Sequence, residues 1–253
     1  MEILEFVLIG MALGLSLGLF GGGGGILAIP LLVAAGIPTD EAGTTSLVVV
    51  GIGAIGGLIP HARAGRVAWR EGVVFSALGI VGALAGSKLA LAVDDHFQLW
   101  GFAIVLIVAG SLMLRKALRT AKHGGEPHPD RHRRSWWLIV PTAAMVGLFT
   151  GFFGVGGGFL VVPALALVMG MSMYLATATA LLVITLNSAV ALIPRAGEAL
   201  DLQATVIVAV FVLISSAVAA RWSNRWSERN LGIGFAGLVL AMSVLTLAQA
   251  SAA

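Results

Sequence analysis

The chain has 253 residues, of which 58% are hydrophobic and 11% are charged, and it carries a formal net charge of +3 and no cysteine. Soluble domains have roughly 25% charged residues, so this composition excludes a water-soluble globular protein. The absence of cysteine from the sequence excludes disulfides, thiolate metal sites and cysteine nucleophiles. The basic residues lie in short stretches between apolar runs and form no basic face interleaved with aromatic residues, so nucleic acid is not an expected partner.

Eight apolar segments follow one another along the chain. Most are long enough to span a membrane, because a helix of about 20 residues crosses a bilayer. They fall at about 3–35, 42–60, 71–93, 97–114, 136–171, 174–193, 204–220 and 230–248. The N-terminus lacks the basic region of a cleaved signal peptide, so the first segment is kept as part of the mature protein. The Gly-, Pro- and charge-rich stretch 115–135 is predicted to be a loop. The sequence therefore predicts an all-α polytopic membrane protein.

The two halves of the chain are copies of each other. GLFGGGGGILAIP (18–30) aligns with GFFGVGGGFLVVP (151–163) and is identical to it at eight of thirteen positions. Further along, EAGTTSL (41–47) matches LATATAL (175–181) and LIPHA (58–62) matches LIPRA (192–196), at a nearly constant offset of 133–134 residues. A repeated offset indicates a duplicated unit. The predicted organisation is a first membrane repeat at 1–114, a cytoplasmic linker loop at 115–135 and a second membrane repeat at 136–253.

The distribution of basic residues predicts the topology, because Lys and Arg concentrate in cytoplasmic loops. Thirteen of the 15 basic residues lie at 63–70, 115–134 and 221–229. Loops 61–70, 115–135 and 221–229 are therefore expected in the cytoplasm and both termini outside, in a multi-pass protein of the plasma membrane.

This topology requires each glycine-containing first segment to cross an even number of times, as a broken helix or hairpin of two short arms. The length agrees, because 33 residues of straight helix would span about 50 Å against a hydrocarbon core of about 30 Å. Each half then crosses an odd number of times. The predicted fold is two inverted-topology repeats, each with a glycine-rich broken first segment plus three transmembrane helices, an arrangement typical of secondary transporters.

The two glycine clusters are the first candidate site. Glycine lets successive backbone N–H groups form an anion-binding concavity at a helix N-terminus, although close helix packing is an alternative use of small residues. Nearby hydroxyl and amide groups could complete the coordination of an oxyanion, or could bond back to their own helix. The predicted substrate-binding residues are Gly21, Gly22, Gly23, Gly24, Gly25, Thr44, Thr45, Gly154, Gly156, Gly157, Gly158, Thr179 and Asn187.

Ionisable residues are scarce in the apolar segments. Apart from Lys88 and residues at segment ends, the segments contain no acid, base or histidine, which weakens a proton-pump or metal-carrier interpretation. No nucleotide-binding fingerprint is complete, and no nucleophile lies beside a base. Enzymatic activity, a metal site and a cofactor are therefore not expected.

The doubled glycine signature, with a Thr-containing helix after each copy, resembles the sulfite exporter TauE/SafE family of bacterial membrane permeases over about residues 3–248. The resemblance implies a carrier linked to the proton motive force that exports sulfite, an organosulfonate such as sulfoacetate or a similar small anion by alternating access. It also implies that the glycines and threonines named above line the cavity. The expected partners are this anion and the lipid bilayer, with a homodimer as a possible assembly. The alternative function is a channel or carrier for another small solute, either a carboxylate or a metal ion.

Overall fold

The computed structural model describes residues 2–122, 136–153, 158–195 and 200–252, which form ten α-helices with no strand among them. The helices are α1 (Glu2–Phe20), α2 (Gly23–Ala34), α3 (Thr39–Arg63), α4 (Trp69–Ala90), α5 (Asp95–Lys122), α6 (Trp136–Phe153), α7 (Gly158–Pro163), α8 (Met173–Leu192), α9 (Leu202–Trp222) and α10 (Glu228–Ala252). A π-helical turn, η1 (Ala164–Val168), follows α7, and the 3-10 turns η2 (Ile193–Arg195) and η3 (Ser223–Arg225) follow α8 and α9.

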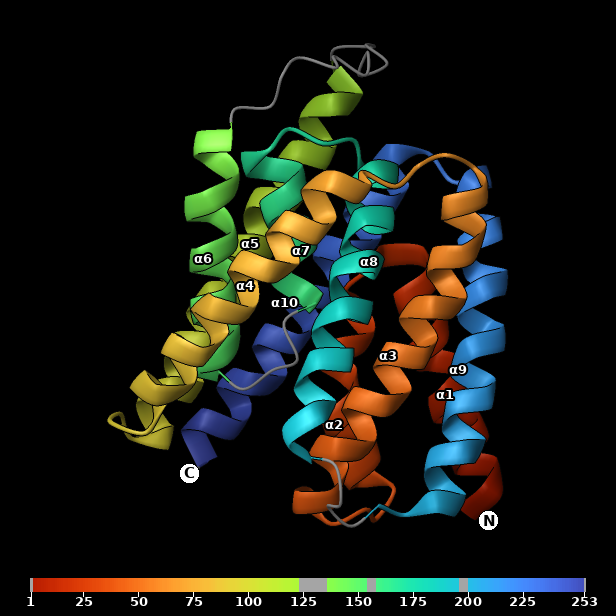
Figure 1. Cartoon of the computed structure of the whole chain (residues 1–253), viewed down its shortest axis with the longest axis vertical. Helices are drawn as coiled ribbons and strands as arrows, with labels where there is room; N and C mark the ends of the chain where they lie inside the picture. Colours follow the sequence, from red (N-terminus) through yellow and green to blue (C-terminus); the bar gives the residue numbers. More distant parts are fainter. Residues whose placement is uncertain (1, 123–135, 154–157, 196–199, 253) are drawn as a thin grey trace.

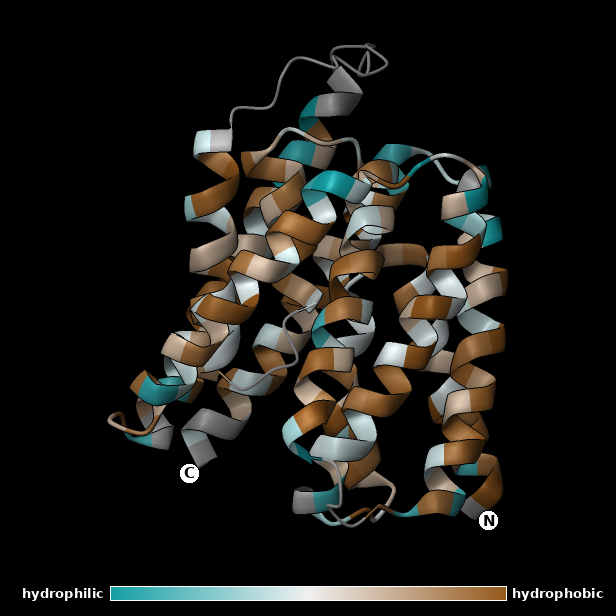
Figure 2. Ribbon diagram, in the orientation of Figure 1, coloured by the Kyte–Doolittle hydropathy of each residue, from teal (hydrophilic) through white to brown (hydrophobic). Residues whose placement is uncertain are grey.

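Seven of these helices are long and apolar enough to cross a membrane. Hydrophilic residues gather at the two ends of the bundle and hydrophobic residues fill the part between them (Figure 2). The outer faces carry many exposed large apolar side chains, among them Leu84 and Trp137. Soluble proteins rarely expose so wide an apolar surface to water. The chain is therefore a multi-pass membrane protein.

The first two helices form a hairpin. In Figure 1, α1 runs inward from the N-terminal end of the bundle and α2 returns to that same end. The turn depends on Gly21, which has a φ of 70° and whose N–H donates to the carbonyl of Leu17 at 2.7 Å. Glycine adopts this left-handed conformation at little cost, so it ends α1 at Phe20. At about 1.5 Å per residue, the 12 residues of α2 span about 18 Å, too short to cross a bilayer.

The corresponding elements of the second half run in the opposite direction. Helix α6 enters from the other end of the bundle, and α7 with η1 returns to that end (Figure 1). The turn η1 is π-helical because Met169 N–H donates to the carbonyl of Ala164, five residues back. Pro163 immediately precedes this turn and lacks an N–H group.

Helix α5 extends further than the sequence predicts. Residues 115–122 are expected in the linker loop, but they continue α5 as helix. That prediction is wrong because RKALRTAK contains neither glycine nor proline, and because Ala117 packs closely against Gly232 of α10. Lys116 Nζ donates to the carbonyls of Ala166 at 2.5 Å and Met171 at 3.1 Å. These two hydrogen bonds connect the end of η1 to α5.

The long helices pack mainly against helices of the other half of the chain: α1 with α9, α4 with α6, α5 with α10, and α3 with α8 and α9. Glycines allow the first two pairs to approach closely. A Cβ built on Gly14 of α1 would lie 2.5 Å from the carbonyl oxygen of Val212, and one built on Gly147 of α6 would lie 2.1 Å from that of Gly79. Backbone contact of this kind is the packing that small residues permit between membrane helices.

Alanine at either of these glycines should therefore destabilise the protein. For Gly14→Ala and Gly147→Ala we expect a loss of about 1–3 kcal/mol, as for other overpacked sites, measured as a lower unfolding temperature in detergent. The matched control is Gly237→Ala in α10, since a Cβ there meets no described atom within 4 Å. Equal melting temperatures for Gly14→Ala, Gly147→Ala and the control would contradict the packing.

Candidate functional site

The break between α1 and α2 leaves backbone donors inside the protein. Gly22 precedes α2 and no side chain caps the helix there, while Gly23, Gly24 and Gly25 form its buried first turn. The first N–H groups of a helix have no partner within the helix, and the helix dipole places partial positive charge at the same point. The N-terminal end of α2 is therefore suited to a negatively charged group.

The two halves of the chain meet at this break. A Cβ built on Gly22 would lie 2.4 Å from the carbonyl oxygen of Gly158, the first residue of α7, and one built on Gly21 would lie 2.6 Å from that of Thr177 in α8. Neither position has room for a side chain. The glycines thus bring α2, α7 and the first part of α8 into direct backbone contact.

Three buried side-chain atoms in the described part of the chain lack a hydrogen-bond partner: Ser16 Oγ, His61 Nε2 and Thr177 Oγ1. Their residues are only 5%, 2% and 1% exposed. Buried polar atoms almost always have partners, and leaving one unpaired costs about 1–3 kcal/mol. Three such atoms in one protein therefore point to groups that bind something else.

All three lie beside the α1–α2 break. Ser16 Oγ is 2.3 Å from the position a Cβ would take on Gly23, and Thr177 Cα is 2.8 Å from the corresponding position on Gly21. The ring of His61 is hydrogen-bonded to the backbone of Gly18, in the last turn of α1. Two hydroxyl groups and one imidazole nitrogen thus lie near the start of α2, which no side chain caps. We call this set of groups, Ser16, His61, Thr177 and the first turn of α2, the hinge site.

The groups of the hinge site are of the kinds that bind small anions. The hydroxyls and backbone N–H groups are donors, and hydrogen bonds from such donors to an ionised acceptor are about twice as strong as neutral ones. A small oxyanion has several acceptor oxygens and a charge that favours the helix N-terminus. The arrangement therefore suits a compact anion better than a cation.

The predicted residues of α8 have protein partners. Thr179 Oγ1 accepts a hydrogen bond from the N–H of Ala68 at 3.2 Å, and Asn187 Oδ1 accepts one from Ser76 Oγ at 2.6 Å. These bonds tie α8 to the start of α4 and to the connection before it. The assignment of Thr179 and Asn187 to a substrate cavity stays a prediction.

The predicted hydroxyls of α3 are bonded to the second half as well. Thr44 Oγ1 accepts from Arg195 Nη1 at 3.2 Å, and Thr205 Oγ1 lies 3.5 Å from Thr45 Oγ1. Both lie in the early turns of α3, at the end of the bundle where α2 joins α3 (Figure 1). Their role in binding also stays a prediction.

Four predicted glycines belong to the second cluster. Gly154, Gly156 and Gly157 lie outside the described residues, and Gly158 is the residue that contacts Gly22 at the break. The structure therefore brings together Gly21 to Gly25 and Gly158 from the predicted set.

The predicted substrate-binding residues do not include Ser16, His61 or Thr177. The apolar segment predicted for the second helix ends at residue 60, but α3 continues to Arg63 and its candidate span includes His61. The repeat alignment held a signal, because it places His61 of LIPHA opposite Arg195 of LIPRA. Ser16 lies one turn before the glycines and could be recognised only once the break was seen to be a sharp turn.

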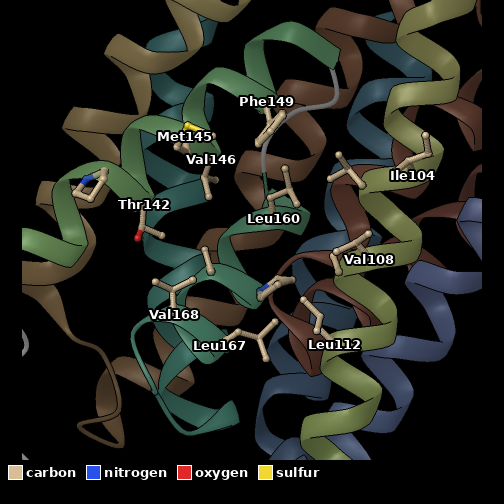
Figure 3. A pocket seen from close by; sticks show the side chains of 15 residues that line it. Ile104, Val108, Leu112, Thr142, Met145, Val146, Phe149, Leu160, Leu167 and Val168 are labelled. Carbon is tan, nitrogen blue, oxygen red and sulfur yellow. The ribbon is translucent and has the colours of Figure 1, made fainter.

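A separate groove lies on the flank of the bundle. It has a volume of about 570 Å³ and is lined by α5, α6, α7 and η1, with Leu112, Phe149 and Leu167 among the labelled side chains (Figure 3). Its lining is almost wholly apolar, and Thr142 is the one polar side chain among the described residues that line it. Such a surface offers an anion no compensation for lost hydration, so the groove does not suit a small anion.

A comparison with known families finds that the family described as "Sulfite exporter TauE/SafE" matches residues 6–246. The chain belongs to this family. A "Probable membrane transporter protein" of Xylella fastidiosa (strain 9a5c) is 39% identical over 192 residues, which cover 71% of each chain. The "Probable membrane transporter protein YunE" of Bacillus subtilis is 27% identical over 210 residues, 74% of this chain and 76% of that protein.

A third relative is the "Probable membrane transporter protein YfcA" of Escherichia coli (strain K12), which is 32% identical over 162 residues, 63% of this chain and 57% of that protein. The names of these relatives describe transporters and not enzymes. The resemblance predicted from the doubled glycine signature is thus confirmed at the level of the TauE/SafE family.

Removing the unpartnered hydroxyls of the hinge site should not lower the thermal stability of this TauE/SafE family protein. Without ligand, we expect Ser16→Ala and Thr177→Val to leave its unfolding temperature unchanged or raise it, because each removes an unpaired buried hydroxyl. The control Ser216→Ala should lower stability by about 1 kcal/mol, since Ser216 Oγ donates to the carbonyl of Gly53. Equal losses for all three variants in a thermal unfolding assay would contradict the assignment of unpaired hydroxyls.

Proposed function

We propose that this protein is a secondary transporter that exports a small sulfur oxyanion or organosulfonate, such as sulfite or sulfoacetate, by alternating access coupled to the proton motive force. The observation that carries the proposal is the hinge site, where the uncapped start of α2 meets the unpartnered hydroxyls of Ser16 and Thr177. The family description, which names sulfite export, supports the choice of anion.

The chemistry of the ligand fits this site. A sulfite or sulfonate group carries three oxygens, so one ligand can accept hydrogen bonds from several backbone and hydroxyl donors at once. An ion that leaves water for a membrane interior loses its hydration, and fixed donors must replace it. The site provides these donors without a permanently charged side chain among its own groups, which favours release as well as binding.

An inverted duplication supports alternating access. The close contacts of α1 with α9 and of α6 with α4 are equivalent under the repeat offset: adding 133 to Gly14 gives Gly147, and adding 133 to Gly79 gives Val212. The hairpins α1–α2 and α6–α7 open toward opposite ends of the bundle (Figure 1). We therefore propose two inverted repeats, at 1–114 and 136–253, that exchange roles as the protein changes the side from which its site is open.

The arrangement of the helices also gives a proposed orientation of the protein in the membrane. Arg63, Arg66 and Arg70 lie at the end of the bundle where α3 joins α4, and Arg221 and Arg225 lie at the same end, where α9 joins α10 (Figure 1). The N- and C-terminal helix ends lie at the opposite end. By the positive-inside rule, we propose that the arginine-rich end faces the cytoplasm and that both termini face outward from the plasma membrane.

Transport of radiolabelled sulfite into proteoliposomes with an imposed pH gradient tests this function. We expect gradient-dependent accumulation by the wild-type protein, and a lower apparent affinity for Ser16→Ala and Thr177→Val, by about tenfold or more, because a hydrogen bond to a charged group contributes about 1.5–3 kcal/mol. The matched control is Ser243→Ala in α10, where the buried hydroxyl donates to the carbonyl of Leu240 in its own helix.

Parallel measurements with acetate and with divalent metal ions test the alternative, a carrier or channel for another solute. Stabilisation of the purified protein by sulfite or a sulfonate, but not by acetate or metal ions, is the expected result. Transport that ignores the pH gradient would contradict the coupling, and an unchanged affinity in both hinge variants would contradict the site.

A further inference from the structure

His61 is a titratable group inside the membrane-spanning part of the protein. The sequence has five histidines, and within the described residues His61 is the one that falls in a candidate span. It is 2% exposed, its ring is hydrogen-bonded to the backbone of Gly18, and its Nε2 has no partner. Ionisable side chains at membrane depth are costly and usually mark ion or substrate pathways.

The hydrogen bond to Gly18 gives this imidazole a fixed orientation. Gly18 lies in the last turn of α1, where backbone carbonyls lack partners within the helix. A carbonyl acceptor requires an N–H on the ring nitrogen that faces it, so in the neutral ring the proton is held there and Nε2 carries the free lone pair. The imidazole can therefore take up one proton at Nε2 without giving up its bond to α1.

The equivalent position in the second half carries a permanent charge. The repeat offset places His61 opposite Arg195, whose Nη1 donates to Thr44 Oγ1 at 3.2 Å. Arginine stays protonated in proteins, whereas the imidazole of histidine exists in both a neutral and a charged form. Of the two matched positions, only the one beside the hinge site can switch its charge.

In the described part of the chain, few other charged groups act on His61. Arg66, three residues after the end of α3, interacts with it electrostatically and also stands over the ring of Tyr174, 5.1 Å from the centroid. Helices α1, α2, α8 and α9 pack against α3. At this end of the bundle α9 contributes the exposed Arg221 and α8 contributes Tyr174, while α2 has no charged residue and the acids of α1 lie at its opposite end.

We propose that His61 is the proton-binding residue of the hinge site: it accepts a proton at Nε2 when an anion occupies the site and releases that proton when the anion leaves. This inference rests on the proposed function. The new N–H bond places a positive charge beside the anion, so proton and monoanion together enter as a neutral pair. Proton and anion are thereby linked by mass action, because each favours the binding of the other.

Binding of methanesulfonate at different pH values tests this role. Sulfite takes up a proton near neutral pH, whereas methanesulfonate stays ionised, so a pH effect on its binding reports the protein. For the wild type we expect affinity to rise by up to tenfold for each unit by which the pH falls, the limit for linkage to one proton. Titration of the purified protein between pH 5.5 and 8, followed by calorimetry or thermal shift, measures this slope.

Two variants remove the titration in opposite ways. His61→Asn keeps a donor for the Gly18 carbonyl but cannot be charged, so we expect weak binding that does not vary with pH. His61→Arg carries a permanent charge like its counterpart Arg195, so we expect binding close to the wild-type value at low pH, again without variation. The control Arg195→Gln removes the charged side chain of the matched position in the second half, and it should keep the wild-type slope.

The outcomes separate this inference from the proposed function. A wild-type slope retained in His61→Asn or His61→Arg would overturn the role of His61 and leave anion transport standing. A wild-type protein that no sulfonate or sulfite stabilises at any pH would overturn both.

Discussion

A membrane protein must satisfy its backbone hydrogen bonds without help from water, so a break inside a membrane helix, such as the one between α1 and α2, needs other groups to support it. Gly21 turns the chain with a positive φ, and its N–H donates to the carbonyl of Leu17. The ring of His61 is hydrogen-bonded to the backbone of Gly18, which also lies in the last turns of α1. The first turn of α2 receives no side-chain cap, and two hydroxyls beside it have no partner. We propose that a small anion completes the hydrogen bonding at this break.

The two halves of the chain depend on each other for this support. Helix α1 packs along α9 and α6 packs along α4, so neither hairpin is held mainly by its own half. Gly22 and Gly158 bring the starts of α2 and α7 into backbone contact at the centre. Glycine thus has two physical roles in this protein: it allows helices of different halves to touch, and it allows the helix itself to break.

Much of this arrangement could be predicted from the sequence, because it depends on length and periodicity. The first apolar segment is longer than a bilayer is thick and is interrupted by glycines, and these two features predicted the α1–α2 hairpin. The duplicated motif predicted the second hairpin, α6–α7. The proposed site residues Ser16 and His61, and Lys116, which bonds α5 to the end of η1, could not be found from length and periodicity alone. A hydropathy profile ends a segment at its first polar residues, whereas α3 and α5 continue past them to Arg63 and Lys122. A missing partner is also a property of packing, which no single stretch of sequence contains.

The most direct measurement is a structure of the protein with bound selenite, a heavier analogue of sulfite whose selenium can be located by anomalous scattering. We predict a selenium peak at the α1–α2 break, with selenite oxygens within hydrogen-bonding distance of Ser16 Oγ, Thr177 Oγ1 and the backbone nitrogens at the start of α2. A peak only elsewhere, for example beside Arg195 and Thr44, with the hinge site empty, would contradict the role of the hinge site in binding the anion.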